Sequence, residues 1–209
     1  MVASAAFSND WGLSSFMCFA RLNESEAQHM DRNHLRWKTS PVLVGAPLAL
    51  WPWLSDGSSL TARIRARCGE LRVRVLRQGL ARPNEDERRI IGLAAGRRAW
   101  LREVLLLADG EPVVFAHTVL APRHLSGPWR MAAGVGGKPL GAALFADPQI
   151  ARGALNCACL KPDHPLHRGA EAVLGAKLPT LWARRSRFLR AEQPLLVTEV
   201  FLPGILRLG

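Results

Sequence analysis

Two apolar stretches joined by a short polar turn constrain the fold of this chain more than any other feature of its sequence. Residues 100–107 and 112–120 are rich in valine, leucine and aromatic side chains, and residues 108–111 (ADGE) stand between them. An Asp-Gly pair between two strand patterns is a strong signal for a tight β-hairpin. The pattern therefore predicts an antiparallel pair of strands in the middle of the chain.

A further strand pattern, at residues 194–203, carries one carboxylate inside an apolar run bounded by prolines. Because side chains alternate between the two faces of a strand, Glu199 shares a face with Leu195, Val197 and Phe201. Burying an ionised carboxylate costs several kcal/mol unless a cation or hydrogen-bond donors meet it. Glu199 therefore needs either a structural partner or a function.

The first strand of the hairpin contains a comparable charge. Arg102 shares its face with Val104 and Leu106, and a guanidinium that cannot lose its proton must meet an anion there. The pattern alone leaves two interpretations open. Arg102 either forms a structural salt bridge with Glu103 or Glu199, or it binds an anionic ligand.

Weaker patterns predict the other elements. Residues 59–69 begin with serine, end with glycine and place apolar side chains at every fourth position, which predicts a short amphipathic helix. Residues 71–77 alternate apolar and basic side chains and predict a strand with one solvent-exposed face. Pro139 favours a helix through Phe145, whereas residues 82–89 are expected to form a charged connector.

Two segments before the last strand leave more than one interpretation open. Asp147 and Pro148 are compatible with the start of a further helix. Residues 181–188, which are dense in arginine, would form either a patch that attracts phosphate or carboxylate groups, or a solvated edge strand whose charges prevent aggregation. The glycine-rich residues 134–137 are not a phosphate-binding loop, because the Gly-Lys-Ser/Thr ending is missing.

Cysteine and histidine residues near the end of the chain invite comparison with zinc sites. Cys157 and Cys159 form a Cys-x-Cys pair, and His164 and His167 form a His-x-x-His pair, with only residues 160–163 between the two pairs. This spacing matches no common zinc finger. We therefore expect an ordinary loop-and-helix insertion here, with no metal.

Length and composition predict one domain, at residues 46–209, preceded by an N-terminal extension, residues 1–45, that is poorly ordered or loosely docked. The cysteines show no paired disulfide framework and the N-terminus lacks a secretory signal, so we expect a reduced, cytoplasmic protein. No segment approaches the roughly 18 consecutive apolar residues that a membrane-spanning helix needs.

The formal net charge of +11 indicates attraction to an anion, which could be nucleic acid, anionic lipid or a small acidic substrate. We do not expect nucleic-acid binding, because no aromatic residues interleave with the basic side chains of residues 71–77. From the residues alone, the chain is an α+β domain with an antiparallel sheet. A buried arginine and a buried glutamate on separate strands are placed to flank a small anionic ligand.

Six segments, taken together and in this order, resemble the chorismate pyruvate-lyase family. The resemblance implies an antiparallel β-sheet flanked by helices, with the ligand enclosed under helical flaps. It also implies a lyase that converts chorismate to 4-hydroxybenzoate and pyruvate, the first step of ubiquinone biosynthesis, without a metal or organic cofactor. We expect a monomer whose partner is the small molecule chorismate. The segments are residues 100–106 (WLREVLL), 108–112 (ADGEP), 125–128 (LSGP), 138–141 (KPLG), 182–186 (WARRS) and 196–203 (LVTEVFLP).

The resemblance assigns candidate site residues one by one. It implies that Arg102 grips the ring carboxylate as a bidentate pair and that Glu199 lies at the hydroxyl end of the ring, so these two are the candidate catalytic residues. Leu140 and Leu60 fall on the flaps as substrate-binding residues. His117 stands where a familiar family member has arginine, and a neutral imidazole would remove a fixed positive charge near a dianionic substrate. We therefore leave His117 out of the predicted site.

A second hypothesis keeps this fold without the catalysis, as a non-catalytic small-anion-sensing domain. A similar fold serves as the effector-sensing domain of some bacterial repressors, which carry a helical DNA-binding domain ahead of it. Residues 1–52 lack a compact helix-turn-helix pattern. The sequence therefore favours the enzyme.

Overall fold

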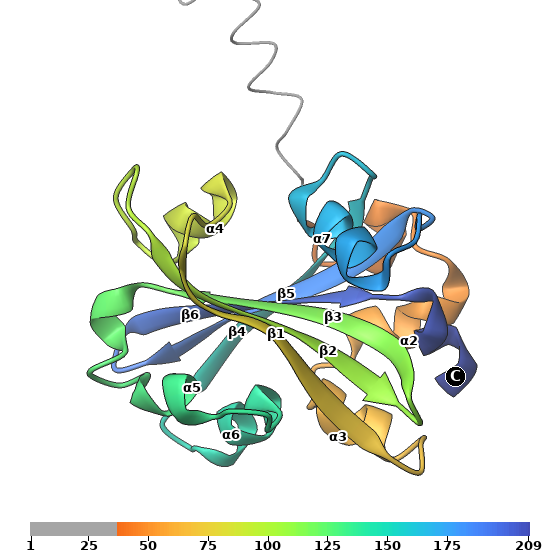
Figure 1. Cartoon of the computed structure of the whole chain (residues 1–209), viewed down its shortest axis with the longest axis horizontal. Coiled ribbons are helices and arrows are strands. Elements are labelled where there is room, and N and C mark those ends of the chain that lie inside the picture. Colours follow the sequence, from red (N-terminus) through yellow and green to blue (C-terminus); the bar gives the residue numbers. More distant parts are fainter. Residues whose placement is uncertain (1–36) are drawn as a thin grey trace, which may run out of the picture. The chain divides into compact units, whose positions relative to one another are not determined.

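Six antiparallel strands form one sheet in the order β1-β2-β3-β6-β5-β4 (Figure 1). The computed structural model describes residues 37–209, so most of the predicted extension at residues 1–45 lies outside the described residues. Strand β1 lies at one edge of the sheet and β4 at the other. The strands are β1 (Leu71–Ala81), β2 (Ala99–Ala108), β3 (Glu111–Leu120), β4 (Ala151–Leu160), β5 (Leu181–Arg190) and β6 (Gln193–Phe201).

The predicted hairpin is formed by β2 and β3. Asp109 and Gly110 make the turn with φ values of 49° and 85°, as a two-residue turn with positive φ at both positions requires. Strand β3 then pairs with β6, with Ala116 opposite Glu199. This long-range pairing leaves only β3 between β6, which carries Glu199, and β2, which carries Arg102.

Helices cover both faces of the sheet, which confirms the predicted α+β class with an antiparallel sheet flanked by helices. Figure 1 shows α3, α5 and α6 on one side and α4 and α7 on the other. The α-helices are α2 (Trp51–Ser55), α3 (Leu60–Arg65), α4 (Glu85–Ile90), α5 (Arg130–Gly134), α6 (Leu140–Ala146) and α7 (Pro165–Leu174), and the 3-10 helices are η1 (Pro41–Val44), η2 (Leu48–Leu50), η3 (Pro122–His124) and η4 (Pro203–Leu208).

The alternation of side chains along the strands sorts them between two apolar layers, as the period of two predicts. On one face, Val104 and Phe201 pack with the buried residues of α2 and α3. On the other face, Leu105 and Val200 pack with Leu166 of α7. Arg102 and Glu199 fall on the first of these faces, the one covered by α2, α3 and α6.

Two predicted helices begin at the expected residues. Helix α3 follows Ser59, whose hydroxyl accepts a hydrogen bond from the backbone N–H of Ala62 at 3.4 Å. It ends at Arg65, earlier than the predicted end at residue 69. Helix α6 begins directly after Pro139, as predicted, and extends through Phe145 to Ala146.

One expectation about local structure was wrong, and two possibilities that the sequence left open are not realised. Helix α4 occupies residues 85–90, where a connector over residues 82–89 was expected, because Asn84 and Glu87 form a capping box at its start. No helix begins at Asp147, whose carboxylate instead accepts a hydrogen bond from the N–H of Gln149 ahead of β4. The arginine-rich strand β5 is not an edge strand, since β6 and β4 flank it.

The segment that contains the Cys-x-Cys and His-x-x-His pairs is also more regular than the predicted loop-and-helix insertion. Cys157 lies on β4 and exchanges backbone hydrogen bonds with Lys38. His164 caps helix α7 by accepting a hydrogen bond from the N–H of Leu166 at 3.2 Å. The ring of His167 hydrogen-bonds the carbonyl of Pro179 at 2.8 Å. Both histidines therefore have structural partners.

Among the helices of residues 37–209, none has the length and apolar character needed to cross a membrane.

Candidate functional site

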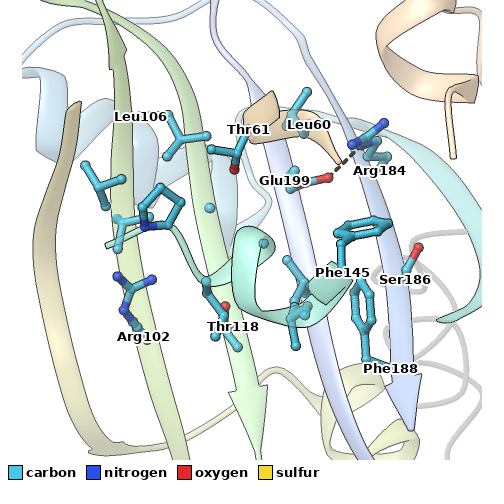
Figure 2. Close-up of a pocket in the computed structure, with 18 of the residues that line it drawn as sticks. Leu60, Thr61, Arg102, Leu106, Thr118, Phe145, Arg184, Ser186, Phe188 and Glu199 are labelled. Atoms are coloured by element: carbon cyan, nitrogen blue, oxygen red, sulfur yellow. Dashed lines mark hydrogen bonds and ion pairs between the residues drawn. The ribbon is translucent and has the colours of Figure 1, made fainter. Parts of the chain in front are cut away.

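A pocket lies between one face of the sheet and helices α3 and α6 (Figure 2). Every strand contributes at least one side chain to its wall. A concave, largely apolar wall with a few polar groups is typical of a site for a small organic ligand. Most lining residues are apolar, so the few charged side chains among them decide what the pocket can bind.

The structure brings all four residues of the predicted site into this pocket. Arg102 lines it from β2 and Glu199 from β6, while Leu60 and Leu140 come from the first positions of α3 and α6. Figure 2 shows Arg102 and Glu199 on opposite sides of the pocket. The two helices that the resemblance implies as flaps are therefore those that cover the pocket.

Arg102 is held by backbone carbonyls and not by a carboxylate. Its side chain is 2% exposed, and Nη2 donates hydrogen bonds to the carbonyls of Gly136 at 2.9 Å and Lys138 at 3.1 Å. Within the described part of the chain, Nε is buried without an acceptor. Burial lowers the pKa of Arg102, but a guanidinium stays charged in proteins. The pocket therefore carries a fixed positive charge with unused donors.

The salt bridges proposed for Arg102 are not formed. Glu103 points to the other face of the sheet, where it contacts His117. Glu199 pairs with a different arginine: Arg184 Nε donates to Glu199 Oε2 at 2.6 Å. Among residues 37–209, Arg102 therefore has no ion-pair partner, which favours the interpretation that it binds an anionic ligand.

Arg184 is the pocket residue that sequence reasoning missed most clearly. It is 1% exposed, and its Nη1 donates to the carbonyls of Trp53 at 2.8 Å and Asp56 at 2.7 Å. These bonds tie helix α2 to the sheet and fix the carboxylate of Glu199. The signal lay in the register, because strands β5 and β6 form a hairpin in which Arg184 stands directly opposite Glu199.

A third arginine, Arg152 of β4, also lines the pocket and was not predicted. Its Nε donates to the hydroxyl of Ser186 at 2.9 Å, and Nη1 donates to the carbonyl of Gly57. The guanidinium lies 5.3 Å from the ring centre of Phe145 and 5.5 Å from that of Phe188. These contacts hold it at the pocket wall.

A family model described as chorismate lyase matches residues 31–207, which is most of the chain. The chain belongs to the chorismate lyase family. A relative from Aromatoleum aromaticum, named probable chorismate pyruvate-lyase, is 54% identical over 82% of this chain and 94% of its own length. A relative of the same name from an Azoarcus species is 56% identical over 76% of this chain and 86% of its own length.

Solved structures show a weaker likeness. A transcriptional regulator of the GntR family from Bacillus cereus aligns with a TM-score of 0.49 and 11% identity over 65% of this chain and 94% of that chain. A likeness at this level does not bear on function.

In this member of the chorismate lyase family, His117 lies outside the pocket and is charged. The sequence had instead suggested a neutral imidazole near the substrate. It points to the other face of the sheet, where it contacts Glu103 at 3.1 Å and Glu87 of α4 at 3.3 Å. Burial alone would lower the pKa of His117, but the two carboxylates outweigh it and raise the pKa to about 9. Its charge therefore stabilises the fold and not the ligand.

We expect the stability of the protein to fall as pH rises from neutral towards pH 9, because His117 has a pKa of 6.5 when unfolded and about 9 when folded. The stabilisation is complete below pH 6.5, declines as pH rises, and is absent above about pH 9. Burial alone would raise the pKa of Glu87, but contact with His117 outweighs it, and the same contact lowers the pKa of Glu103. Both pKa values are lowered from 4.5, so the contribution of the two carboxylates holds above pH 4.5 and is lost as pH falls.

Urea unfolding at a series of pH values checks this expectation. At neutral pH, His117→Gln should remove on the order of 3 kcal/mol from the free energy of unfolding. The variant should also lose the decline between neutral pH and pH 9. If the variant keeps the pH dependence of the wild type, His117 is not the titrating group.

Proposed function

We propose that this protein is a chorismate pyruvate-lyase, which eliminates pyruvate from chorismate and releases 4-hydroxybenzoate in the first step of ubiquinone biosynthesis. The names of its relatives support the reaction. The observation that carries the proposal is the pocket itself, in which Arg102, without an ion-pair partner among the described residues, faces Glu199 across a largely apolar space. Such a space suits a ring with a carboxylate at one end and a hydroxyl at the other.

The proposed reaction turns the ring of chorismate into an aromatic ring. The carbon–oxygen bond to the enolpyruvyl group breaks, and the ring carbon that carries the hydroxyl loses a proton. The released enolpyruvate gains a proton at its methylene carbon and becomes pyruvate. Protons and electrons balance without an oxidant or reductant, so the protein needs to orient the substrate, exclude water and assist the proton transfer.

Each predicted site residue has a role in this proposal. Arg102 binds the ring carboxylate through charge-assisted hydrogen bonds. Glu199, oriented by Arg184, accepts a hydrogen bond from the ring hydroxyl and assists the removal of the neighbouring proton. Leu60 and Leu140 cover the ring from helices α3 and α6 and keep water out of the pocket.

The test is to incubate the purified full-length protein with chorismate and to measure 4-hydroxybenzoate and pyruvate by chromatography. We expect the two products in equal amounts, at a rate that an added chelator does not change, because every role falls to a side chain. Absence of products would contradict the proposal. Tight binding of 4-hydroxybenzoate without turnover would instead support the small-anion-sensing alternative.

A further inference from the structure

The charged residues of the pocket do not balance one another. Three arginines and one glutamate line it, and the glutamate is already paired, because Glu199 binds Arg184 at 2.6 Å. Arg102 and Arg152 remain, and neither has a carboxylate within salt-bridge distance among residues 37–209. Two guanidinium groups without a directly paired carboxylate among the described residues suit a ligand with two negative charges.

The two arginines stand at different ends of the pocket. Arg102 projects from β2, and four strand-to-strand steps separate β2 from β4, which carries Arg152. Arg152 donates to the hydroxyl of Ser186, which is two residues along β5 from Arg184 and therefore on the same face. Arg152 consequently lies at the Glu199 end of the pocket, away from Arg102.

This arrangement matches the chemistry of chorismate, which has two carboxylates. One is bonded to the ring, and the other belongs to the enolpyruvyl group, whose ether oxygen is bonded to the ring carbon next to the one with the hydroxyl. With the ring carboxylate at Arg102 and the hydroxyl at Glu199, the second carboxylate must lie beside Glu199. We propose that Arg152 binds the enolpyruvyl carboxylate of the substrate, an inference that rests on the proposed function.

The contacts of Arg152 prepare it for this role. Nε donates a hydrogen bond to Ser186 and Nη1 donates one to Gly57, whereas Nη2 has no acceptor in the described part of the chain. The rings of Phe145 and Phe188 also contact the guanidinium, whose central carbon lies 5.3 Å and 5.5 Å from their centres. Because Gly57 precedes α3 and Phe145 belongs to α6, a carboxylate bound by Arg152 also lies where the two covering helices meet the sheet.

The proposal gives the pocket a means of distinguishing substrate from product. Both chorismate and 4-hydroxybenzoate have a ring carboxylate for Arg102, but only chorismate has a second carboxylate for Arg152. After the elimination, that carboxylate leaves with pyruvate. A purely structural role for Arg152, as a link between the helices and β4, would instead affect substrate and product equally.

The test compares Arg152→Met with Arg152→Lys and with a matched control, Arg187→Met, which removes an exposed arginine of β5. For Arg152→Met we expect kcat/KM for chorismate to fall by about 100-fold, mainly through KM, because a charge-assisted contact at a half-buried position in the pocket is lost. The affinity for 4-hydroxybenzoate, measured by calorimetry, should stay within about twofold. Arg152→Lys should retain part of the activity, and Arg187→Met should match the wild type.

Equal losses for chorismate and 4-hydroxybenzoate, or no loss for either, would overturn the role of Arg152. If Arg152→Met does not fold, 3-(carboxymethoxy)-4-hydroxybenzoate provides a second measurement, because it adds a carboxylate next to the ring hydroxyl. Arg152→Lys should then weaken binding of this compound more than binding of 4-hydroxybenzoate, and equal weakening would overturn the proposal. A wild-type protein that makes no product contradicts the proposed function, whereas an active wild type with an unaffected Arg152→Met contradicts only this inference.

Discussion

Replacing Arg102 with methionine is expected to weaken the binding of both chorismate and 4-hydroxybenzoate by about 100- to 1,000-fold, the cost of losing one partner of a buried charge pair. Arg102 is the positive charge at its end of the pocket, where its unused donors face the ring carboxylate in our proposal. Methionine keeps an apolar side chain of similar reach but cannot donate a hydrogen bond. Both ligands should lose the same contact.

Folding should not account for this loss. Arg102→Met gives up two hydrogen bonds to backbone carbonyls, but it also removes a buried charge that has no counter-ion among residues 37–209, and these effects oppose each other. Calorimetric titration with 4-hydroxybenzoate, together with thermal unfolding, measures the two quantities separately. Arg74→Met is the matched control, because Arg74 is exposed on the neighbouring strand β1. Wild-type affinity in Arg102→Met would rule out its role as the carboxylate clamp.

Elements with strong local signals were predictable from the sequence. The Asp109-Gly110 turn fixed the central hairpin, and the serine at residue 59 and proline at residue 139 marked the starts of α3 and α6. The period of two along a strand also placed Arg102 and Glu199 on buried faces. Each of these inferences depends only on residues that lie close together in the chain. The side chain that causes the turn, the helix start or the alternation lies in the same segment as the structure it produces.

The partners of these residues were not predictable in the same way. The turn between β5 and β6 uses Ala191 and Glu192 at φ values of 47° and 58°, which are not the residues that usually mark a tight turn. Without that hairpin, nothing in the sequence places Arg184 opposite Glu199. The raised pKa of His117 likewise depends on Glu87, a residue 30 positions away on α4.

The position of Arg152 in the pocket was also not predictable from the sequence. Its segment lacks a clear alternating pattern, and β4 contains an irregularity in its pairing with β5 between Arg152 and Leu155. From the sequence, an arginine in such a segment is expected to be a solvent-exposed charge. Its contacts with Phe145 and Phe188 come from the packing of α6 on the sheet, which no local pattern specifies.

Replacing Glu199 with glutamine is expected to lower kcat for chorismate by about 100- to 1,000-fold, the usual contribution of a general acid–base group. The amide has nearly the shape of the carboxylate, and its oxygen can still accept the hydrogen bond from Arg184 Nε. It cannot take up the ring proton. The affinity for 4-hydroxybenzoate should therefore fall much less than kcat, within about tenfold.

Glu103→Gln separates this effect from the general cost of removing a carboxylate beside a cation. The side chains of Glu103 and Glu199 are 21% and 19% exposed, and each pairs with a buried basic residue, but Glu103 lies on the face away from the pocket. Glu103→Gln should therefore lose stability while kcat stays within about twofold of the wild type. Unchanged kcat in Glu199→Gln would remove Glu199 from proton transfer and leave it a binding role alone, whereas equal losses of kcat in both variants would trace the effect to the sheet and not to the reacting ring.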